Sequence, residues 1–152
     1  MQDYIIQKLQ PEDYKKSENS IDPNRDAPRS RRWYNDLLSG NRVMFSYTEN
    51  GEFIGEAALV FRSEDPDYTI PGKRIYLSAM IIKDGHRNRG IGGLLIDHLL
   101  SCAKDMGYEE MSVGVDIINI GARWLYEKKG FLNIVFVGED SDGKYVKLLK
   151  AL

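Results

Sequence analysis

Two periodicities alternate along the chain and predict its secondary structure. Short runs of alternating or continuous apolar residues, each bounded by Gly, Pro, Asn or Asp, have the pattern of β-strands. After Gly90 the period changes, because apolar residues recur every three or four positions as far as Met106, and Gly107 follows as a helix stop. We therefore expect strands over residues 4–9, 43–48, 53–61, 74–83, 110–115, 131–137 and 144–149, and helices over residues 31–38, 91–106 and 121–129.

The segments between these elements carry turn and loop signals. Asn50-Gly51 joins two predicted strands, and this dipeptide readily adopts the left-handed conformations that a tight hairpin needs. The sequence Asp-Ser-Asp-Gly over residues 140–143 predicts a second hairpin. Residues 11–32 are polar and contain Pro23 and Pro28, so we expect a loop there with at most a short helix.

The order of the predicted elements defines the fold class. A strand and a helical region are followed by three strands, a helix, a strand, a helix and two strands, which is typical of a mixed α/β layer fold. The strand over residues 74–83 is apolar on both faces, as expected for a central strand covered on both sides. No repeat or linker divides the 152 residues, so we expect a single domain over residues 1–152.

Composition and charge exclude several classes of function. With 42% hydrophobic residues and a formal net charge of −2, the chain is of ordinary globular type and has no basic field to attract nucleic acid. Its apolar runs are short, so no membrane partner is expected, and its first residues lack the pattern of a secretory signal. The single cysteine, Cys102, excludes an intramolecular disulfide and fits a reducing cytoplasm, where we expect the protein to act.

The turn over residues 87–93, Arg-Asn-Arg-Gly-Ile-Gly-Gly, carries the clearest chemical signal. A strand leads into it and a long helix leaves it, and a helix N-terminus offers backbone N–H groups and a partial positive charge to an anion. Its three glycines let phosphate oxygens approach the backbone, and its two arginines add charge. The turn therefore suits a pyrophosphate. It lacks the third glycine of a dinucleotide-binding G-x-G-x-x-G, because that position is Leu95, and no P-loop Gly-Lys-Ser/Thr occurs.

Two motifs instead resemble those of a known family. The pattern R-x-x-G-x-G, formed by Arg87, Gly90 and Gly92, resembles the CoA-pyrophosphate loop of the GNAT superfamily of N-acetyltransferases. Residues 119–131 are similar to the family's second signature, in which an asparagine, an alanine, a tyrosine and a terminal Gly-Phe keep fixed spacing. The resemblance covers nearly the whole chain and is weakest over residues 10–40.

The resemblance implies both a fold and an activity. The fold would be a central mixed, largely antiparallel sheet of about seven strands flanked by helices on both faces. The activity would be acetyl-CoA-dependent transfer of an acetyl group to a primary amine of a small molecule or peptide, by direct attack and without a metal. A catalytically weak CoA-binding regulatory module of the same fold is the alternative, and an unrelated nucleotide-binding protein is a more distant one. The resemblance leaves open whether the protein is a monomer or a homodimer.

The same resemblance assigns residues to acetyl-CoA binding and to acid catalysis. Asn119 would hydrogen-bond the pantetheine arm, although an asparagine there also suits a helix N-cap. Tyr126 would protonate the departing CoA thiolate, or else pack against the glycine-rich turn. The backbone of Met80, Ile81 and Ile82 would pair with the pantetheine arm, and the pyrophosphate would be held by the turn residues Arg87, Asn88, Arg89, Gly90, Ile91, Gly92 and Gly93.

The general base and the acceptor are less clearly indicated. Some relatives carry a carboxylate where this chain has Tyr76, and others carry one where this chain has Gly114. Because neither position holds a carboxylate here, the remaining candidates for the general base are Glu56, Asp116 and an ordered water. Of these we prefer Glu56. The charges near the expected acceptor site conflict and do not define the amine. An acidic metabolite would be attracted by Arg25, Arg29, Arg31 and Arg32, whereas a cationic amine would be attracted by Asp65, Asp67 and Asp116.

Overall fold

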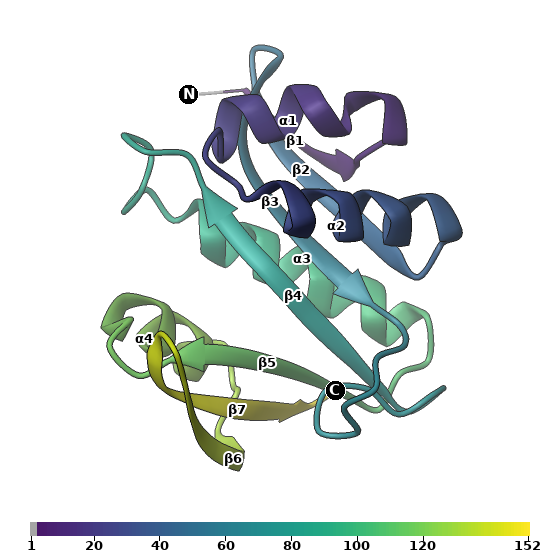
Figure 1. The fold of residues 1–152 in the computed structure, drawn as a ribbon, viewed down its shortest axis with the longest axis vertical. Coiled ribbons are helices and arrows are strands. Elements are labelled where there is room, and N and C mark those ends of the chain that lie inside the picture. The colour runs from purple at the N-terminus through teal and green to yellow at the C-terminus, as the bar shows by residue number, and fades with distance from the viewer. Residues whose placement is uncertain (1–2) are drawn as a thin grey trace. The chain divides into compact units, whose positions relative to one another are not determined.

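A computed structural model describes residues 3–152, which form seven strands, four α-helices and one short 3-10 helix (Figure 1). The strands lie within a few residues of the sequence prediction. In chain order the elements are β1 (Tyr4–Lys8), η1 (Pro11–Asp13), α1 (Tyr14–Ile21), α2 (Ala27–Ser39), β2 (Arg42–Glu49), β3 (Glu52–Val60), β4 (Arg74–Ile82), α3 (Ile91–Asp105), β5 (Glu110–Asp116), α4 (Ile120–Lys128), β6 (Asn133–Asp140) and β7 (Gly143–Ala151).

The strands are hydrogen-bonded in the order β1-β2-β3-β4-β5-β7-β6. The pairs β1–β2, β5–β7 and β6–β7 are antiparallel, whereas β4 and β5 run parallel. The β4–β5 register extends from Arg74↔Glu110 to Leu77↔Val113 and ends there. This topology confirms the prediction of a mixed, largely antiparallel sheet of about seven strands.

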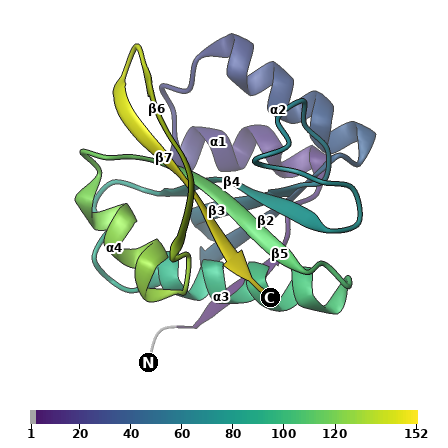
Figure 2. The same ribbon diagram turned by 90° about the horizontal axis from the view of Figure 1, so that it is seen from below.

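The chain divides into two compact units that share β4. The first comprises residues 1–59 and 79–98, and the second comprises residues 60–78 and 99–152. Within the first unit, α1 and α2 cover one face of the strands and the beginning of α3 covers the opposite face (Figures 1 and 2). Helices therefore flank both faces of the strands in this unit, as predicted.

Each face of the first unit has its own apolar packing. On the side of α1 and α2, buried residues of both helices pack with residues of β2 and β3, and Trp33 and Ile81 pack against this core. On the side of α3, Gly55 leaves room for the side chains of Ile82, Ile91 and Leu95. The core on the side of α1 and α2 contains Leu9, Tyr14, Ile21, Leu37, Met44, Phe53 and Ala58.

The prediction of a loop with at most a short helix over residues 11–32 understates the helical content of this segment. This segment forms η1, α1 and the beginning of α2, and Asp26 caps α2 by accepting a hydrogen bond from the backbone N–H of Arg29 at 2.8 Å. Pro28 lies in the first turn of α2, where a proline is tolerated because its missing N–H is not needed. The spacing of apolar residues did not predict α1, because its buried face includes the polar residues Ser17 and Glu18.

The other boundaries follow from turn chemistry. Asn50 and Gly51 have φ values of 51° and 81°, which confirms the predicted tight hairpin between β2 and β3. The β6–β7 hairpin turns at Asp140–Gly143, as expected. The fully buried side chains of the second unit include Phe131, Met111 and Leu148. No helix within residues 3–152 is long and apolar enough to cross a membrane.

Candidate active site

The glycine-rich turn connects β4 to α3 in the first unit. Asn88 and Gly90 have φ values of 63° and 83°, so the backbone passes twice through the left-handed region just before the helix begins. The first helical hydrogen bond of α3 runs from the Leu94 N–H to the Gly90 carbonyl at 3.2 Å. The backbone N–H groups of residues 91–93 precede that bond and belong to the first turn, where an anion would find unpaired donors.

The two arginines of the turn are already paired with carboxylates. Arg87 forms an exposed ion pair with Asp84 at 2.8 Å. Arg89 pairs with Glu49 at the end of β2, and its Nη1 also lies 2.7 Å from Nδ1 of His86. The sequence suggested the charge of these arginines but did not reveal Glu49, because 40 residues separate Glu49 from Arg89.

Glu49 is held from two sides. Its carboxylate accepts hydrogen bonds from Arg89 and, at 3.0 Å, from the hydroxyl of Tyr47. Burial raises the pKa of Glu49, but the hydrogen bonds from Arg89 and Tyr47 outweigh this effect, so its pKa lies below the ordinary value. Glu49 is therefore a negative charge fixed beside the glycine-rich turn.

The strand before the turn departs from regular geometry. Ala79 has a φ of 59°, a conformation that is unfavourable for a residue with a side chain and unusual within a strand. The next three residues of β4 are half-buried: Met80, Ile81 and Ile82. They lie beyond Leu77↔Val113, the last residue pair at which β4 and β5 are paired.

The second unit holds the predicted acid and the predicted asparagine, both associated with α4. Tyr126 is buried, and its ring meets Phe131 edge-on with centroids 5.7 Å apart. Burial raises the pKa of Tyr126 above its ordinary value, and Tyr76 adds to this effect. Asn119 accepts a hydrogen bond from the Ala122 N–H at 3.2 Å, which confirms that it is the N-cap of α4. Asp116 is exposed at the end of β5.

The structure brings together the two positions at which a carboxylate is missing. Tyr76 of β4 stacks on Tyr68 with ring centroids 4.3 Å apart. The hydroxyl oxygen of Tyr68 lies too close to Gly114 to leave room for a Cβ at residue 114, and the Cζ of Tyr68 lies 3.1 Å from the position of that Cβ. Sequence analysis did not single out Tyr68, because it lies in a loop and no spacing relates it to Gly114.

Asp65 and Asp67 are not free charges in this structure. Lys147 of β7 donates hydrogen bonds to Asp65 at 2.6 Å and to Asp67 at 3.2 Å. Its ammonium also lies 5.0 Å from the centroid of the Tyr68 ring and 4.5 Å from that of Phe136. The hydrogen bond from Lys147 lowers the pKa of Asp65 and outweighs the smaller opposing effect of burial.

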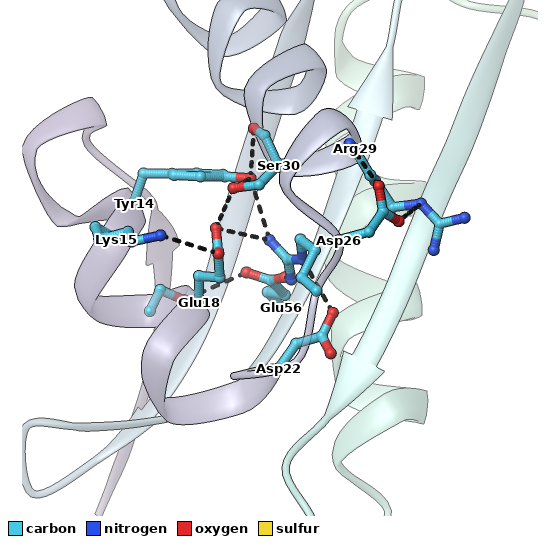
Figure 3. A network of polar contacts seen from close by, with 10 residues as sticks. Tyr14, Lys15, Glu18, Asp22, Asp26, Arg29, Ser30 and Glu56 are labelled. Atoms are coloured by element: carbon cyan, nitrogen blue, oxygen red, sulfur yellow. Dashed lines mark hydrogen bonds and ion pairs between the residues drawn. The ribbon is translucent and has the colours of Figure 1, made fainter.

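Glu56 lies in a buried polar network between α1, α2 and β3 (Figure 3). It is 1% exposed, pairs with the guanidinium of Arg25, and accepts a hydrogen bond from the Ser17 hydroxyl at 3.3 Å. Burial raises the pKa of Glu56, while the Arg25 charge and hydrogen bond act against it. The sequence suggested Glu56 as the base but gave no sign of this pairing.

Arg25 is the centre of the same network. Its guanidinium also pairs with Asp22 at 2.9 Å and with Glu18 at 3.9 Å, and lies 4.6 Å from the Trp33 ring. Its side chain is fully buried, so Arg25 is not the solvated or substrate-steering charge that the sequence suggested. Arg29 pairs with Asp26 at 3.6 Å on the surface.

Comparison with known proteins identifies related sequences. A model of the acetyltransferase (GNAT) family matches residues 5–131. N-acetyltransferase 8 and N-acetyltransferase 8B of Homo sapiens are each 34% identical over 65 residues, which is 43% of this chain. The match spans only 29% of the length of these curated relatives.

Solved structures share the fold over almost the whole chain. An IAA acetyltransferase from Bacillus cereus has a TM-score of 0.76 at 17% identity, covering 99% of this chain and 100% of that one. The ribosomal-protein-S18-alanine N-acetyltransferase from Escherichia coli has a TM-score of 0.79 at 17% identity, covering 98% and 94%. A GNAT family acetyltransferase from Elizabethkingia anophelis with acetyl-CoA bound has a TM-score of 0.73 at 18% identity, covering 98% of each chain. At such low identity the likeness establishes the fold, and it confirms the predicted fold class.

Proposed function

Because this chain belongs to the acetyltransferase (GNAT) family, we propose that it transfers the acetyl group of acetyl-CoA to a primary amine of a small molecule or peptide. The observation that carries the proposal is the turn before α3. Asn88 and Gly90 adopt left-handed conformations there, and the N–H groups of residues 91–93 precede the first helical hydrogen bond. This arrangement suits the pyrophosphate of CoA. A solved structure with the same fold contains acetyl-CoA, which also supports the proposal.

The chain contains residues that fit the remaining parts of acetyl-CoA. In the proposal, the backbone of Met80, Ile81 and Ile82 pairs with the pantetheine arm, because these residues lie beyond the β4–β5 register. Asn119 contacts the same arm through its amide N–H₂, since its side-chain oxygen already accepts a hydrogen bond from Ala122. The pyrophosphate is bound by Arg87, Asn88, Arg89, Gly90, Ile91, Gly92 and Gly93.

Tyr126 is the proposed general acid. Bound acetyl-CoA supplies an activated thioester, and direct attack by the amine releases a thiolate that must gain a proton. The raised pKa of Tyr126 keeps its phenol protonated at neutral pH, so the hydroxyl is ready to donate. A thiolate is a tolerable leaving group, so this donation is worth about 10²-fold in rate or less.

Glu56 is the proposed general base, acting through a relay. The Glu56 carboxylate is buried, so a bulky amine does not reach it in this conformation. The proton of the amine therefore passes to the carboxylate through the Ser17 hydroxyl or a water. Its raised pKa supports the role, because a base works best when its pKa approaches the working pH. Asp116, exposed at the end of β5, and an ordered water are the alternative bases.

A catalytically weak CoA-binding module is the second candidate. The observation that favours it is the absence of a carboxylate at Tyr76 and Gly114, together with the ion pair that engages Glu56. A panel of amines with acetyl-CoA, scored by free thiol, separates the two candidates. Thiol release that depends on an amine supports the enzyme, whereas stabilisation by acetyl-CoA without thiol release supports the module.

The single cysteine fits a reducing compartment, so we propose that this activity is cytoplasmic.

A further inference from the structure

The loop between β3 and β4 is fixed at several points within the second unit. Nη1 of Arg74 donates hydrogen bonds to the backbone carbonyls of Pro66 and Asp67, each at 3.1 Å. The Ser112 hydroxyl donates to the carbonyl of Tyr68 at 2.6 Å. Lys147 binds the carboxylates of the same loop, as described above. Tyr68 therefore projects from a loop whose backbone is held to β4 and β5 and whose carboxylates are held to β7.

The ring of Tyr68 is fixed as well. Tyr76 stacks on it at an interplanar angle of 25°, and the Lys147 ammonium lies over it. These contacts define the ring plane and direct its hydroxyl toward Gly114. Gly114 has no left-handed φ that would require a glycine, so the space taken by the Tyr68 hydroxyl is the physical reason for a glycine there. The polar end of Tyr68 is thus positioned by packing on its ring.

Tyr76 lies close enough to both Tyr68 and the proposed acid, Tyr126, to act on each. Tyr76 stacks on Tyr68 and also acts electrostatically on Tyr126. Burial raises the pKa of Tyr68, so its phenol stays neutral and can both donate and accept a hydrogen bond. Lys147 binds both Asp65 and Asp67 beside Tyr68, so these three groups keep one net negative charge, which favours a cationic acceptor over an anionic one.

We propose that the Tyr68 hydroxyl, seated against Gly114, contacts the acceptor and selects a cationic primary amine without a carboxylate of its own. This inference rests on the proposed acetyl transfer. The hydroxyl accepts a hydrogen bond from the amine nitrogen and orients it for attack. The stacked rings of Tyr68 and Tyr76 form a wall along which the acceptor lies.

Tyr68→Phe tests the inference, because it keeps the ring and its contacts and removes only the hydroxyl. We expect kcat/KM for the preferred amine to fall about tenfold, as loss of one hydrogen bond implies, with KM for acetyl-CoA and the melting temperature unchanged. Tyr108→Phe is the matched control, since Tyr108 packs near Phe61 in the same unit and outside the tyrosine group. It should leave all three quantities unchanged.

Gly114→Ala approaches the same contact from the other side. Its methyl group would clash with the Tyr68 hydroxyl and displace it, so kcat/KM for the amine should fall as in Tyr68→Phe. The two changes combined should cost little more than either alone. Unchanged amine kinetics in Tyr68→Phe, or a preference for carboxylated amines in the wild-type protein, would overturn the inference. A wild-type protein inactive with every amine would overturn the proposed function itself, and this inference with it.

Discussion

The guanidinium of Arg25 is paired with the carboxylate of Glu56, although the two residues are 31 positions apart in the chain. Arg25 lies between α1 and α2, and Glu56 lies in the middle of β3, so the pair ties the helical segment to this strand. Both side chains are almost completely buried, which makes the pair sensitive to loss of either partner.

Replacement of Arg25 by methionine should destabilise the protein strongly. The change leaves the buried carboxylate of Glu56 without its ion-pair partner, whereas Glu18 keeps Lys15 at 3.3 Å. Breaking a buried pair in this way costs about 3–5 kcal/mol. Arg29→Met is the control, because its ion pair with Asp26 is exposed and should contribute less than about 1 kcal/mol. Urea unfolding of both variants measures the difference, and equal stabilities would show that the Arg25 network is not needed for folding.

Replacement of Glu56 by glutamine tests its role as the base. If Glu56 removes the proton of the amine, turnover below the pKa of the amine should fall by about 10²-fold or more. The loss should shrink as pH rises, because free amine then becomes available without help. A pH profile of turnover checks this, with folding verified separately because Glu56 is also part of the buried network. Unaltered turnover in a folded variant would transfer the role to Asp116, and unaltered turnover in Asp116→Asn as well would leave ordered water.

Replacement of Glu49 by glutamine should strengthen acetyl-CoA binding. Glu49 places a negative charge beside the turn that we propose for the pyrophosphate and occupies Arg89. Removing that charge should lower KM for acetyl-CoA about threefold or more at low salt, with a smaller effect at high salt. Glu52→Gln, which loses a partly exposed pair with Lys83, should leave this KM unchanged. Weaker binding in Glu49→Gln would mean instead that Glu49 orients Arg89 toward the phosphates.

Replacement of Tyr126 by phenylalanine should lower turnover and leave acetyl-CoA affinity nearly intact. Only the hydroxyl is lost, and the ring keeps its packing against Phe131. The loss in turnover should be about 10²-fold or less, because the thiolate can leave without full assistance. Steady-state kinetics with several amines provide the test. Equal turnover with every accepted amine would reduce Tyr126 to a packing role.

The strands and α3 were predictable because their signals are local. Alternation of apolar residues, Asn50-Gly51 and the helical spacing after Gly90 act over a few neighbouring positions and agree with the final fold. The helix α1 was missed because two of its four buried residues, Ser17 and Glu18, are polar, so only Tyr14 and Ile21 mark its helical period. Hydrophobic periodicity therefore cannot reveal it.

The parts of the candidate site differ in the same way. The glycine-rich turn between β4 and α3 could be located from the sequence because its glycines and arginines are contiguous. The pairing of Arg89 with Glu49, and of the Tyr68 hydroxyl with Gly114, could not be predicted, because each joins residues about 40 or more positions apart. In both cases the partner of a recognisable residue is supplied by the tertiary fold.

Acetyl transfer itself is tested most directly by following the acetyl group. The wild-type protein is incubated with acetyl-CoA labelled in the acetyl group and with the amine that gives most thiol release, and the label is located by mass spectrometry. We predict that labelled amide forms in step with free CoA thiol, and that no label stays on the protein. Failure to form labelled amide with any amine, despite intact binding of acetyl-CoA, would contradict the proposed function.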